Sequence, residues 1–122
     1  MIKVLIVDDD YMQLQLDEIF VPKFSRGYTP ITAKNGDEAI SQYKTNNDIE
    51  IIVFDTDLRP SREKGWEVYD KLRMLGYEGR VLARSSDLTS EIVKEWELRN
   101  VPLVEKNMPK DLEYHLDKVL DE

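Results

Sequence analysis

The sequence predicts an α/β domain with a doubly wound, five-stranded parallel sheet and five helices. Short apolar runs rich in Val and Ile recur along the 122 residues, and segments with helical spacing lie between them. Apolar runs of this length without polar alternation are typical of strands buried on both faces. Strand and helix alternate five times, which favours a parallel sheet with helices on both sides.

The apolar runs are the expected strands. In chain order they cover residues 4–7, 28–32, 51–54, 81–83 and 101–104. The second run contains Pro30, which cannot donate a ladder hydrogen bond. We therefore expect that strand at an edge of the sheet.

Apolar residues at i, i+3 and i+4 predict five helices, each with an apolar face toward the sheet. Asp10, with Gln13 three residues later, is typical of a capping box at the start of the first helix, and Pro109 suits the first position of the last helix. The expected apolar faces are Met12, Leu16, Ile19 and Phe20; Ala39, Ile40 and Tyr43; Val68, Leu72 and Leu75; Ile92, Val93 and Trp96; Leu112, Leu116, Val119 and Leu120.

Length and composition limit the classes of function. No linker or repeat divides the chain, so we expect a single domain over residues 1–122. The formal charge of −8 disfavours direct binding to nucleic acid or to anionic lipids. The chain has no cysteine and no apolar run of the ~20 residues that a membrane span needs, and its first apolar run is too short for a signal peptide. We expect a soluble, cytoplasmic protein.

Carboxylates follow two of the expected strands. Asp8, Asp9 and Asp10 come directly after the first strand, and Asp55 comes directly after the third. In doubly wound sheets these strand ends border the crevice where ligands bind, so we expect the carboxylates to converge there. Like charges this close repel unless a cation holds them, and an open oxygen site suits Mg²⁺ better than Ca²⁺. For Asp10 we favour a capping role.

Two further polar side chains follow the remaining strands. Ser85 comes after the fourth strand and Lys106 after the fifth. A hydroxyl, an ammonium group and a divalent cation around one carboxylate supply the charge neutralisation that a tetrahedral dianion needs. A carboxylate in that position can be the nucleophile that accepts a phosphoryl group, and Asp55 is the candidate.

These residues together resemble the receiver domain of two-component response regulators, of the stand-alone, chemotaxis-regulator-like kind. The resemblance rests on VLIVDDD ending at Asp10, IIVFD ending at Asp55, TAKNGDEA over residues 32–39, Ser85 and Lys106. It covers essentially the whole chain in order. It implies the receiver fold with strand order 2-1-3-4-5.

The resemblance also implies a role for each site residue. Asp8 and Asp9 would hold Mg²⁺, with Asp55 and the main-chain carbonyl of Asp57 completing the metal site. Asp55 would be phosphorylated, and Ser85 and Lys106 would bind the phosphoryl oxygens. Such a domain assists its own phosphorylation and dephosphorylation without being a classical turnover enzyme.

A phosphorylation-dependent switch implies protein partners. The donor would be a sensor histidine kinase or a histidine phosphotransfer protein, and the target a downstream protein that the sequence does not name. Phosphorylation would shift a two-state equilibrium and alter a face formed by helix four, around residues 91–98, strand five and helix five. We expect no output domain after Glu122, so the signal would leave by binding another protein or by onward phosphotransfer, from a monomer or weak dimer.

Several positions depart from the family pattern. Pro60 and Gly65 come later after Asp55 than the family has them, so the loop from Leu58 to Gly65 is longer and more charged. Leu103 replaces the aromatic residue usual three positions before the lysine, so a swinging ring cannot carry the signal. Asn107 replaces the Pro that commonly follows Lys106.

Three alternative functions are compatible with parts of the sequence. The stretch VFDTDL also resembles the nucleophile motif of haloacid dehalogenase phosphatases, with Asp55 as nucleophile and Asp57 as acid/base. A flavodoxin-like nucleotide carrier shares the fold class, but three aspartates after the first strand argue against phosphate binding there. A pseudo-receiver would take no phosphate and serve only as an interaction module.

Three other side chains invite a functional interpretation. Trp66 and Trp96 are expected to pack in the core rather than to stack on a ligand. Arg84 lies inside the fourth strand, where we assign it no role in the core. We expect it to reach outward to solvent or to face a partner.

Overall fold

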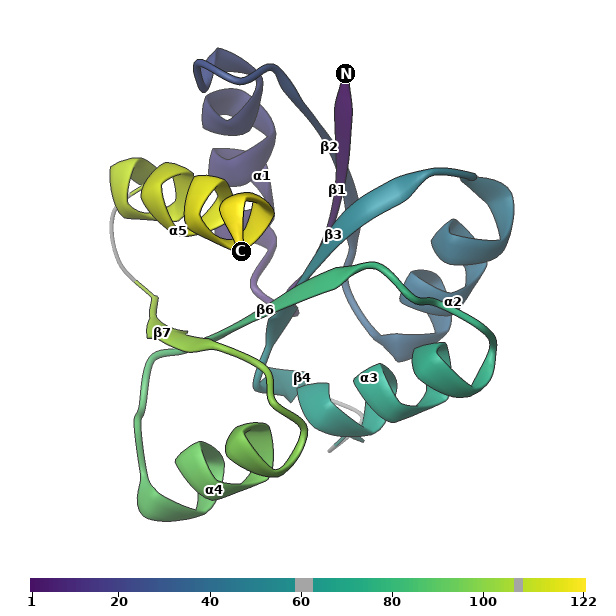
Figure 1. Cartoon of the computed structure of the whole chain (residues 1–122), viewed down its shortest axis with the longest axis vertical. Helices are drawn as coiled ribbons and strands as arrows, with labels where there is room; N and C mark the ends of the chain where they lie inside the picture. Colours follow the sequence, from purple (N-terminus) through teal and green to yellow (C-terminus); the bar gives the residue numbers. More distant parts are fainter. Residues whose placement is uncertain (59–62, 107–108) are drawn as a thin grey trace.

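The computed structural model describes residues 1–58, 63–106 and 109–122, with the backbone alone for residues 109 and 110. Its main sheet is fully parallel, as the sequence predicts, and its order β2-β1-β3-β6-β7 is the one that the family resemblance implies (Figure 1). Pro30 lies in β2, which pairs with β1 at one edge, so the predicted edge position is confirmed. The strands are β1 (Ile2–Val7), β2 (Tyr28–Ala33), β3 (Ile49–Asp55), β6 (Arg80–Ser85) and β7 (Leu103–Glu105).

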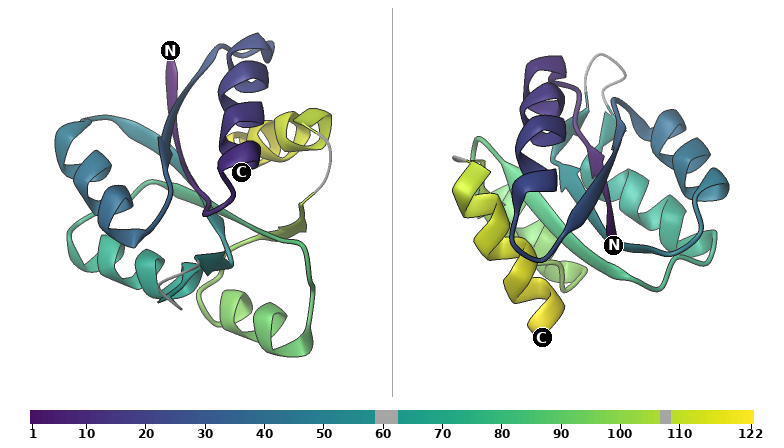
Figure 2. Two further views of the ribbon diagram at one scale, coloured as in Figure 1. Left: turned by 180° about the vertical axis from the view of Figure 1, so that it is seen from behind. Right: turned by 90° about the horizontal axis from the view of Figure 1, so that it is seen from above.

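The helices cover both faces of this sheet (Figures 1 and 2). One face is covered by α1 and α5, and the other by α2, α3 and α4. No helix in the described ranges is long and apolar enough to cross a membrane. Their bounds are α1 (Tyr11–Phe20), α2 (Gly36–Thr45), α3 (Gly65–Met74), α4 (Ser90–Leu98) and α5 (Pro109–Asp121), with a short 3-10 turn η1 (Val21–Lys23) after α1.

Each face of the sheet has its own apolar core, because side chains along a strand alternate between the faces. Leu5 of β1 belongs to the core under α2, α3 and α4, and Ile6 belongs to the core under α1 and α5. Trp66 and Trp96 are both buried in the first core, so their predicted packing role is confirmed.

The prediction that the apolar residues of α1 face the sheet is wrong. Met12 and Ile19 are 71% and 54% exposed, and Leu16 and Phe20 are also exposed. The helix instead turns Leu14 and Asp17 toward the sheet, where both are buried. A polar residue can take that position because Arg84 pairs with Asp17 in the core. In α3, Leu75 is also exposed, whereas Val68 and Leu72 are buried as expected.

The start of α1 follows the sequence expectation in part. Asp10 is the N-cap residue, and its carboxylate accepts hydrogen bonds from the amides of Met12 and Gln13. The side chain of Gln13, however, donates to Asp17 instead of returning to the cap. Asp10 therefore caps the helix, but the reciprocal capping box is not formed. At the other end of the chain, α5 begins at Pro109 as expected.

The long segment after Asp55 contains an additional small hairpin, which the sequence does not predict. The strands β4 (Asp57–Leu58) and β5 (Glu63–Lys64) pair antiparallel. Pro60, like Arg59 and Arg62, lies outside the described residues, as does Asn107. The hairpin leads into α3 at Gly65, whose amide donates to the carbonyl of Thr56 at 2.7 Å. The longer loop thus returns the chain to the end of β3.

Candidate functional site

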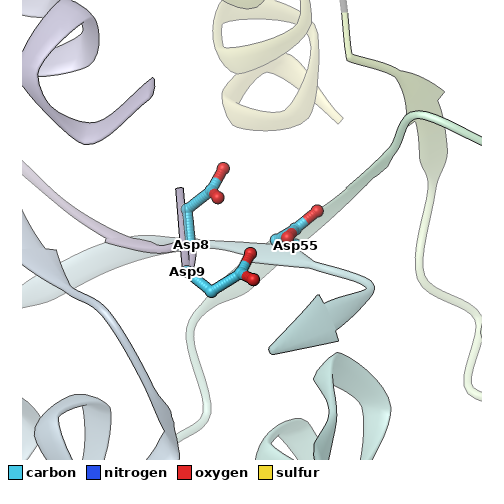
Figure 3. A group of neighbouring side chains, drawn as sticks. All are labelled: Asp8, Asp9 and Asp55. Carbon is cyan, nitrogen blue, oxygen red and sulfur yellow. The ribbon is translucent and has the colours of Figure 1, made fainter. Parts of the chain in front are cut away.

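Three carboxylates meet at the carboxyl end of the sheet (Figure 3). Asp8 and Asp9 follow β1, Asp55 ends β3, and the two strands are neighbours with Val7 opposite Phe54. One oxygen from each of the three carboxylates lies within 4.8 Å of the others. Asp8 is fully buried and Asp55 is 7% exposed. The predicted convergence of Asp8, Asp9 and Asp55 is therefore present.

Lys106 provides a positive charge directly beside these acids. It follows β7, and its amide donates to the Ser85 carbonyl at 3.0 Å, which fixes the end of β7 against the end of β6. Its Nζ lies 2.6 Å from Asp8 Oδ2 and 3.5 Å from Asp55 Oδ1. In this conformation the ammonium group lies closer to the carboxylate of Asp8 than to that of Asp55.

Ser85 lies in the same site, but its hydroxyl is directed to its own loop. The Oγ donates to the main-chain carbonyl of Asp87 at 2.5 Å and accepts from the Asp87 amide at 3.2 Å. The side chain is buried and lines the same pocket as Asp55. A phosphoryl contact therefore requires the hydroxyl to exchange its partner.

An open pocket of about 430 Å³ connects these groups to solvent. It is lined almost entirely by polar side chains, most of them acidic. The lining residues are Asp9, Asp10, Asp55, Asp57, Ser85, Ser86, Asp87 and Lys106. A small anion can reach Asp55 only with compensation of this negative charge.

Asp57 borders the pocket from the hairpin. Its carboxylate accepts a hydrogen bond from Lys64 Nζ across the β4–β5 pair. The carboxylate is thus held in an ion pair on the hairpin. Metal binding by the Asp57 main-chain carbonyl stays a prediction.

Burial controls the protonation of the acids. Removal from water and the charge of Asp8 raise the pKa of Asp55, the contact with Lys106 lowers it, and the net result is a pKa of about 7. Burial also raises the pKa of Asp8, and the contact with Lys106 opposes this effect. A cation at the pocket would favour ionised Asp55, the form that can act as a nucleophile.

The chemistry of the site fits a hard divalent cation. Its candidate ligand atoms are the carboxylate oxygens of Asp8, Asp9 and Asp55. Such ligands match the preference of Mg²⁺, which keeps several waters and takes a few carboxylates. The open pocket leaves space for those waters.

The sequence reasoning missed a buried charge pair next to the site. Arg84 is 3% exposed, and its Nη2 lies 2.9 Å from Asp17 Oδ2 and 3.6 Å from Asp8 Oδ2. The expectation that Arg84 reaches solvent or a partner is therefore wrong. The available signal was a basic residue inside a buried strand together with an acidic residue inside an apolar helix, because each needs the other in a core.

A second missed contact joins α4 to the residue after Asp55. The Thr56 hydroxyl donates to the Arg84 carbonyl at 3.1 Å and accepts from Trp96 Nε1 at 3.2 Å. Trp96 is fully buried, and its ring packs near Phe54, with centroids 6.0 Å apart. The sequence offered no signal for this pairing, because the two residues are 40 positions apart.

Comparison with solved structures identifies the fold as that of response regulator receiver domains. No family model matches the sequence, and no curated protein matches it significantly. The chemotaxis protein CheY4 of Vibrio cholerae is similar over 98% of both chains, with 24% identity and a TM-score of 0.86. At identities this low, the similarity shows the fold alone.

Two further structures show the same fold. A CheY-like receiver domain protein from Methanospirillum hungatei is 22% identical with a TM-score of 0.86, over 99% of this chain and 94% of that one. The BeF3-activated DrrB receiver domain is 18% identical with a TM-score of 0.81, over 100% of this chain and 99% of that one. The likeness thus extends over the whole chain.

Proposed function

We propose that this protein is a phosphorylation-dependent signalling switch of a two-component system or phosphorelay. The observation that supports it most is the convergence of Asp8, Asp9 and Lys106 on the buried carboxylate of Asp55. The receiver fold provides the same arrangement of strand ends. We further propose that the domain acts in the cytoplasm, as a monomer or weak dimer, and assists its own phosphorylation rather than turning over a substrate.

In the proposed reaction, an oxygen of the Asp55 carboxylate attacks the phosphorus atom of phosphohistidine on a kinase or phosphotransfer protein. The phosphorus–oxygen bond forms, the phosphorus–nitrogen bond breaks, and the released imidazole takes up a proton. Asp55 must be ionised for this attack. Mg²⁺, held by Asp8, Asp9, Asp55 and the Asp57 carbonyl, would neutralise the carboxylates and the incoming phosphoryl oxygens.

The other two site residues then respond to the new charge. Lys106 lies 3.5 Å from Asp55 already, and a phosphoryl dianion there competes with Asp8 for its ammonium group. Ser85 exchanges its bond to the Asp87 carbonyl for a phosphoryl oxygen. This exchange changes the start of the segment that leads from β6 to α4.

The contact between Trp96 and Thr56 offers a route for the signal where Leu103 cannot supply one. Thr56 follows Asp55 directly and also bonds the Arg84 carbonyl, next to Ser85. A shift at the ends of β3 and β6 therefore acts on the indole that anchors α4. Helix α4, with β7 and α5, is the proposed output face.

The exposed apolar residues of α1 support a protein partner. Met12, Leu16, Ile19 and Phe20 form this α1 stripe, which begins two residues after Asp10 at the pocket rim. Exposed apolar patches beside a reactive site are typical of interaction surfaces. We propose that the phosphohistidine-bearing protein contacts this stripe while it reaches Asp55.

A phosphatase of the haloacid dehalogenase type is less well supported. That mechanism needs Asp57 as a mobile acid/base, whereas its carboxylate is paired with Lys64 on the hairpin. A pseudo-receiver has some support from the closer approach of Lys106 to Asp8 than to Asp55. These alternatives differ in what happens to a phosphodonor.

The decisive experiment is incubation with Mg²⁺ and acetyl phosphate, followed by mass spectrometry. We expect one alkali-labile phosphoryl group on Asp55 and none in Asp55→Asn. The variant Asp87→Asn, at an exposed carboxylate of the same pocket, is the matched control and should still be labelled. Absence of label in the wild type would support the pseudo-receiver, and continuous release of phosphate through Asp57 would support the phosphatase.

A further inference from the structure

A line of alternating buried charges runs from α1 to Asp55. Gln13 Nε2 donates to Asp17 Oδ1 at 3.0 Å, and Asp17 Oδ2 pairs with Arg84 at 2.9 Å. The same Arg84 nitrogen lies 3.6 Å from Asp8 Oδ2, which also contacts Lys106. Side-chain alternation places Asp8 and Arg84 on the sheet face under α1, where Asp17 meets them.

Both oxygens of Asp8 are already engaged by positive or donor groups. Asp8 Oδ1 accepts a hydrogen bond from the Asp10 amide at 2.9 Å. Asp8 Oδ2 faces the ammonium group of Lys106 and the guanidinium of Arg84. A divalent ion that binds Asp8 must therefore share a carboxylate that two cations already neutralise.

The contacts of Arg84 indicate an electrostatic role rather than packing alone. Its Nε has no hydrogen-bond partner within the described part of the chain, although the side chain is only 4% exposed. A buried donor without a partner is unfavourable, so the retained guanidinium must be stabilised by its charge. Among the described residues, the carboxylates of Asp17 and Asp8 form ion pairs with it.

We propose that Arg84 is a resident counter-cation of the acidic pocket, and that it lowers the affinity of the pocket for Mg²⁺. Lys106 is the cation expected to meet the phosphoryl group, whereas Arg84 lies behind Asp8 and stays with it. The pocket is therefore partly neutralised before any metal binds. Asp17 limits this effect, because it takes part of the guanidinium charge. The inference rests on the proposed magnesium site.

The test is isothermal titration calorimetry of the full chain with MgCl₂ at neutral pH and low salt. In Arg84→Met, which removes the charge and keeps most of the volume, we expect the Kd for Mg²⁺ to fall about tenfold or more. In Asp17→Asn, which leaves the guanidinium uncompensated, we expect the Kd to rise by about threefold or more. A general loosening of the core would change the Kd in the same direction in both variants, so shifts of the Kd in opposite directions indicate an electrostatic effect.

Three further variants complete the test. Arg84→Lys retains the charge and should bind Mg²⁺ within about threefold of the wild type. Arg99→Met removes an arginine that is ion-paired with Asp70 and Glu95 at the end of α4, away from the pocket lining, and should leave the Kd unchanged. If Arg84→Met does not fold, the double variant Asp17→Asn/Arg84→Met removes the whole ion pair. It should still bind Mg²⁺ more tightly than the wild type, because Arg84 lies next to Asp8 and its positive charge therefore affects the metal site more than the negative charge of Asp17 does.

The possible outcomes separate this inference from the proposed function. An unchanged or weaker affinity in folded Arg84→Met and in the double variant overturns the role of Arg84 while leaving the metal site in place. Absence of Mg²⁺ binding in the wild type and in every variant overturns the metal site and this inference with it. Binding that is weak in the wild type and strong in Arg84→Met supports both.

Discussion

Asp55 lies at the end of β3 with 7% of its surface exposed, next to the fully buried Asp8. Burial and the neighbouring charge both favour its protonated form, and they raise its pKa to about 7. Protonated and ionised Asp55 are therefore both populated at neutral pH when no cation is bound, and only the ionised form can act as a nucleophile. A bound cation favours ionisation, so metal binding and reactivity are coupled at this single side chain.

Because the pKa of Asp55 is raised, the free energy of unfolding measured without Mg²⁺ should depend on pH. The folded-state value of about 7 lies above the unfolded value, so the stabilising effect of the proton is fully present below ~3.9 and is lost as pH rises through about 7. In urea titrations without Mg²⁺, we expect the free energy of unfolding of Asp55→Asn to increase relative to that of the wild type as the pH rises through this range. The gain should reach roughly 2 to 4 kcal/mol near pH 8. If the difference in free energy of unfolding between the two proteins stays constant from acid to alkaline pH, the raised pKa of Asp55 is contradicted.

Gly65 matters because of its contacts rather than its backbone freedom. A Cβ atom there would collide with the main-chain carbonyl oxygen of Asp55 and press on the ring of Trp96. We expect Gly65→Ala to lower the free energy of unfolding by roughly 1 to 3 kcal/mol. Gly36→Ala is the matched control at another helix start, since its Cβ meets only the movable carboxylate of Glu63 and should cost less than ~0.5 kcal/mol. Equal losses in both variants would show that the contact with Asp55 is not tight.

Among the secondary-structure elements, α1 departs furthest from the sequence expectation. The expected apolar face is the exposed α1 stripe, and the buried face includes Asp17. Helical spacing locates a stripe but cannot tell which side meets the sheet when a buried ion pair replaces an apolar contact. The pairing with Arg84, 67 residues away, decides the orientation.

The two faces of α1 should respond differently to substitution. We expect Ile19→Lys on the stripe to change stability by no more than ~0.5 kcal/mol, and Leu14→Ala on the buried face to cost about 2 to 5 kcal/mol. Phosphotransfer from a partner protein should slow in Ile19→Lys, while labelling by acetyl phosphate stays normal. Loss of both reactions in Ile19→Lys would mean that the stripe serves the fold and not a partner.

The hydrogen bond from Trp96 to Thr56 links helix α4 to the site. Phosphorylation of Asp55, one residue away from Thr56, should therefore alter the indole environment. We expect acetyl phosphate with Mg²⁺ to change the tryptophan emission of the wild type and of Trp66→Phe, but not of Trp96→Phe. A change that persists in Trp96→Phe and is absent from Trp66→Phe would place the route along α3 instead.

Much of the fold follows from local patterns in the sequence. Short apolar runs locate the strands, Pro30 indicates the edge, and the strand ends bring Asp8, Asp55 and Lys106 together, because parallel strands place their carboxyl ends at one edge. The β4–β5 hairpin, whose strands have only two residues each, has no such pattern. The bonds of Thr56 and Arg84 join distant parts of the chain and depend on packing that no local spacing encodes.

In the whole molecule, an excess of negative charge meets a site built from carboxylates. The formal charge is −8, and most residues that line the pocket are acidic. Self-repulsion of this kind destabilises the compact state, and a bound cation relieves it. Metal binding should therefore stabilise the entire domain and not the pocket alone.

Magnesium-linked stability tests this coupling most directly, by urea unfolding at neutral pH with increasing MgCl₂. An ion that binds only the folded state adds about 2.7 kcal/mol at a concentration of one hundred times its Kd. We expect the wild-type urea midpoint to rise accordingly, and Asp9→Ala, which removes one carboxylate of the group, to show no rise. The same midpoint with and without Mg²⁺ in the wild type would contradict a cation site at Asp8, Asp9 and Asp55.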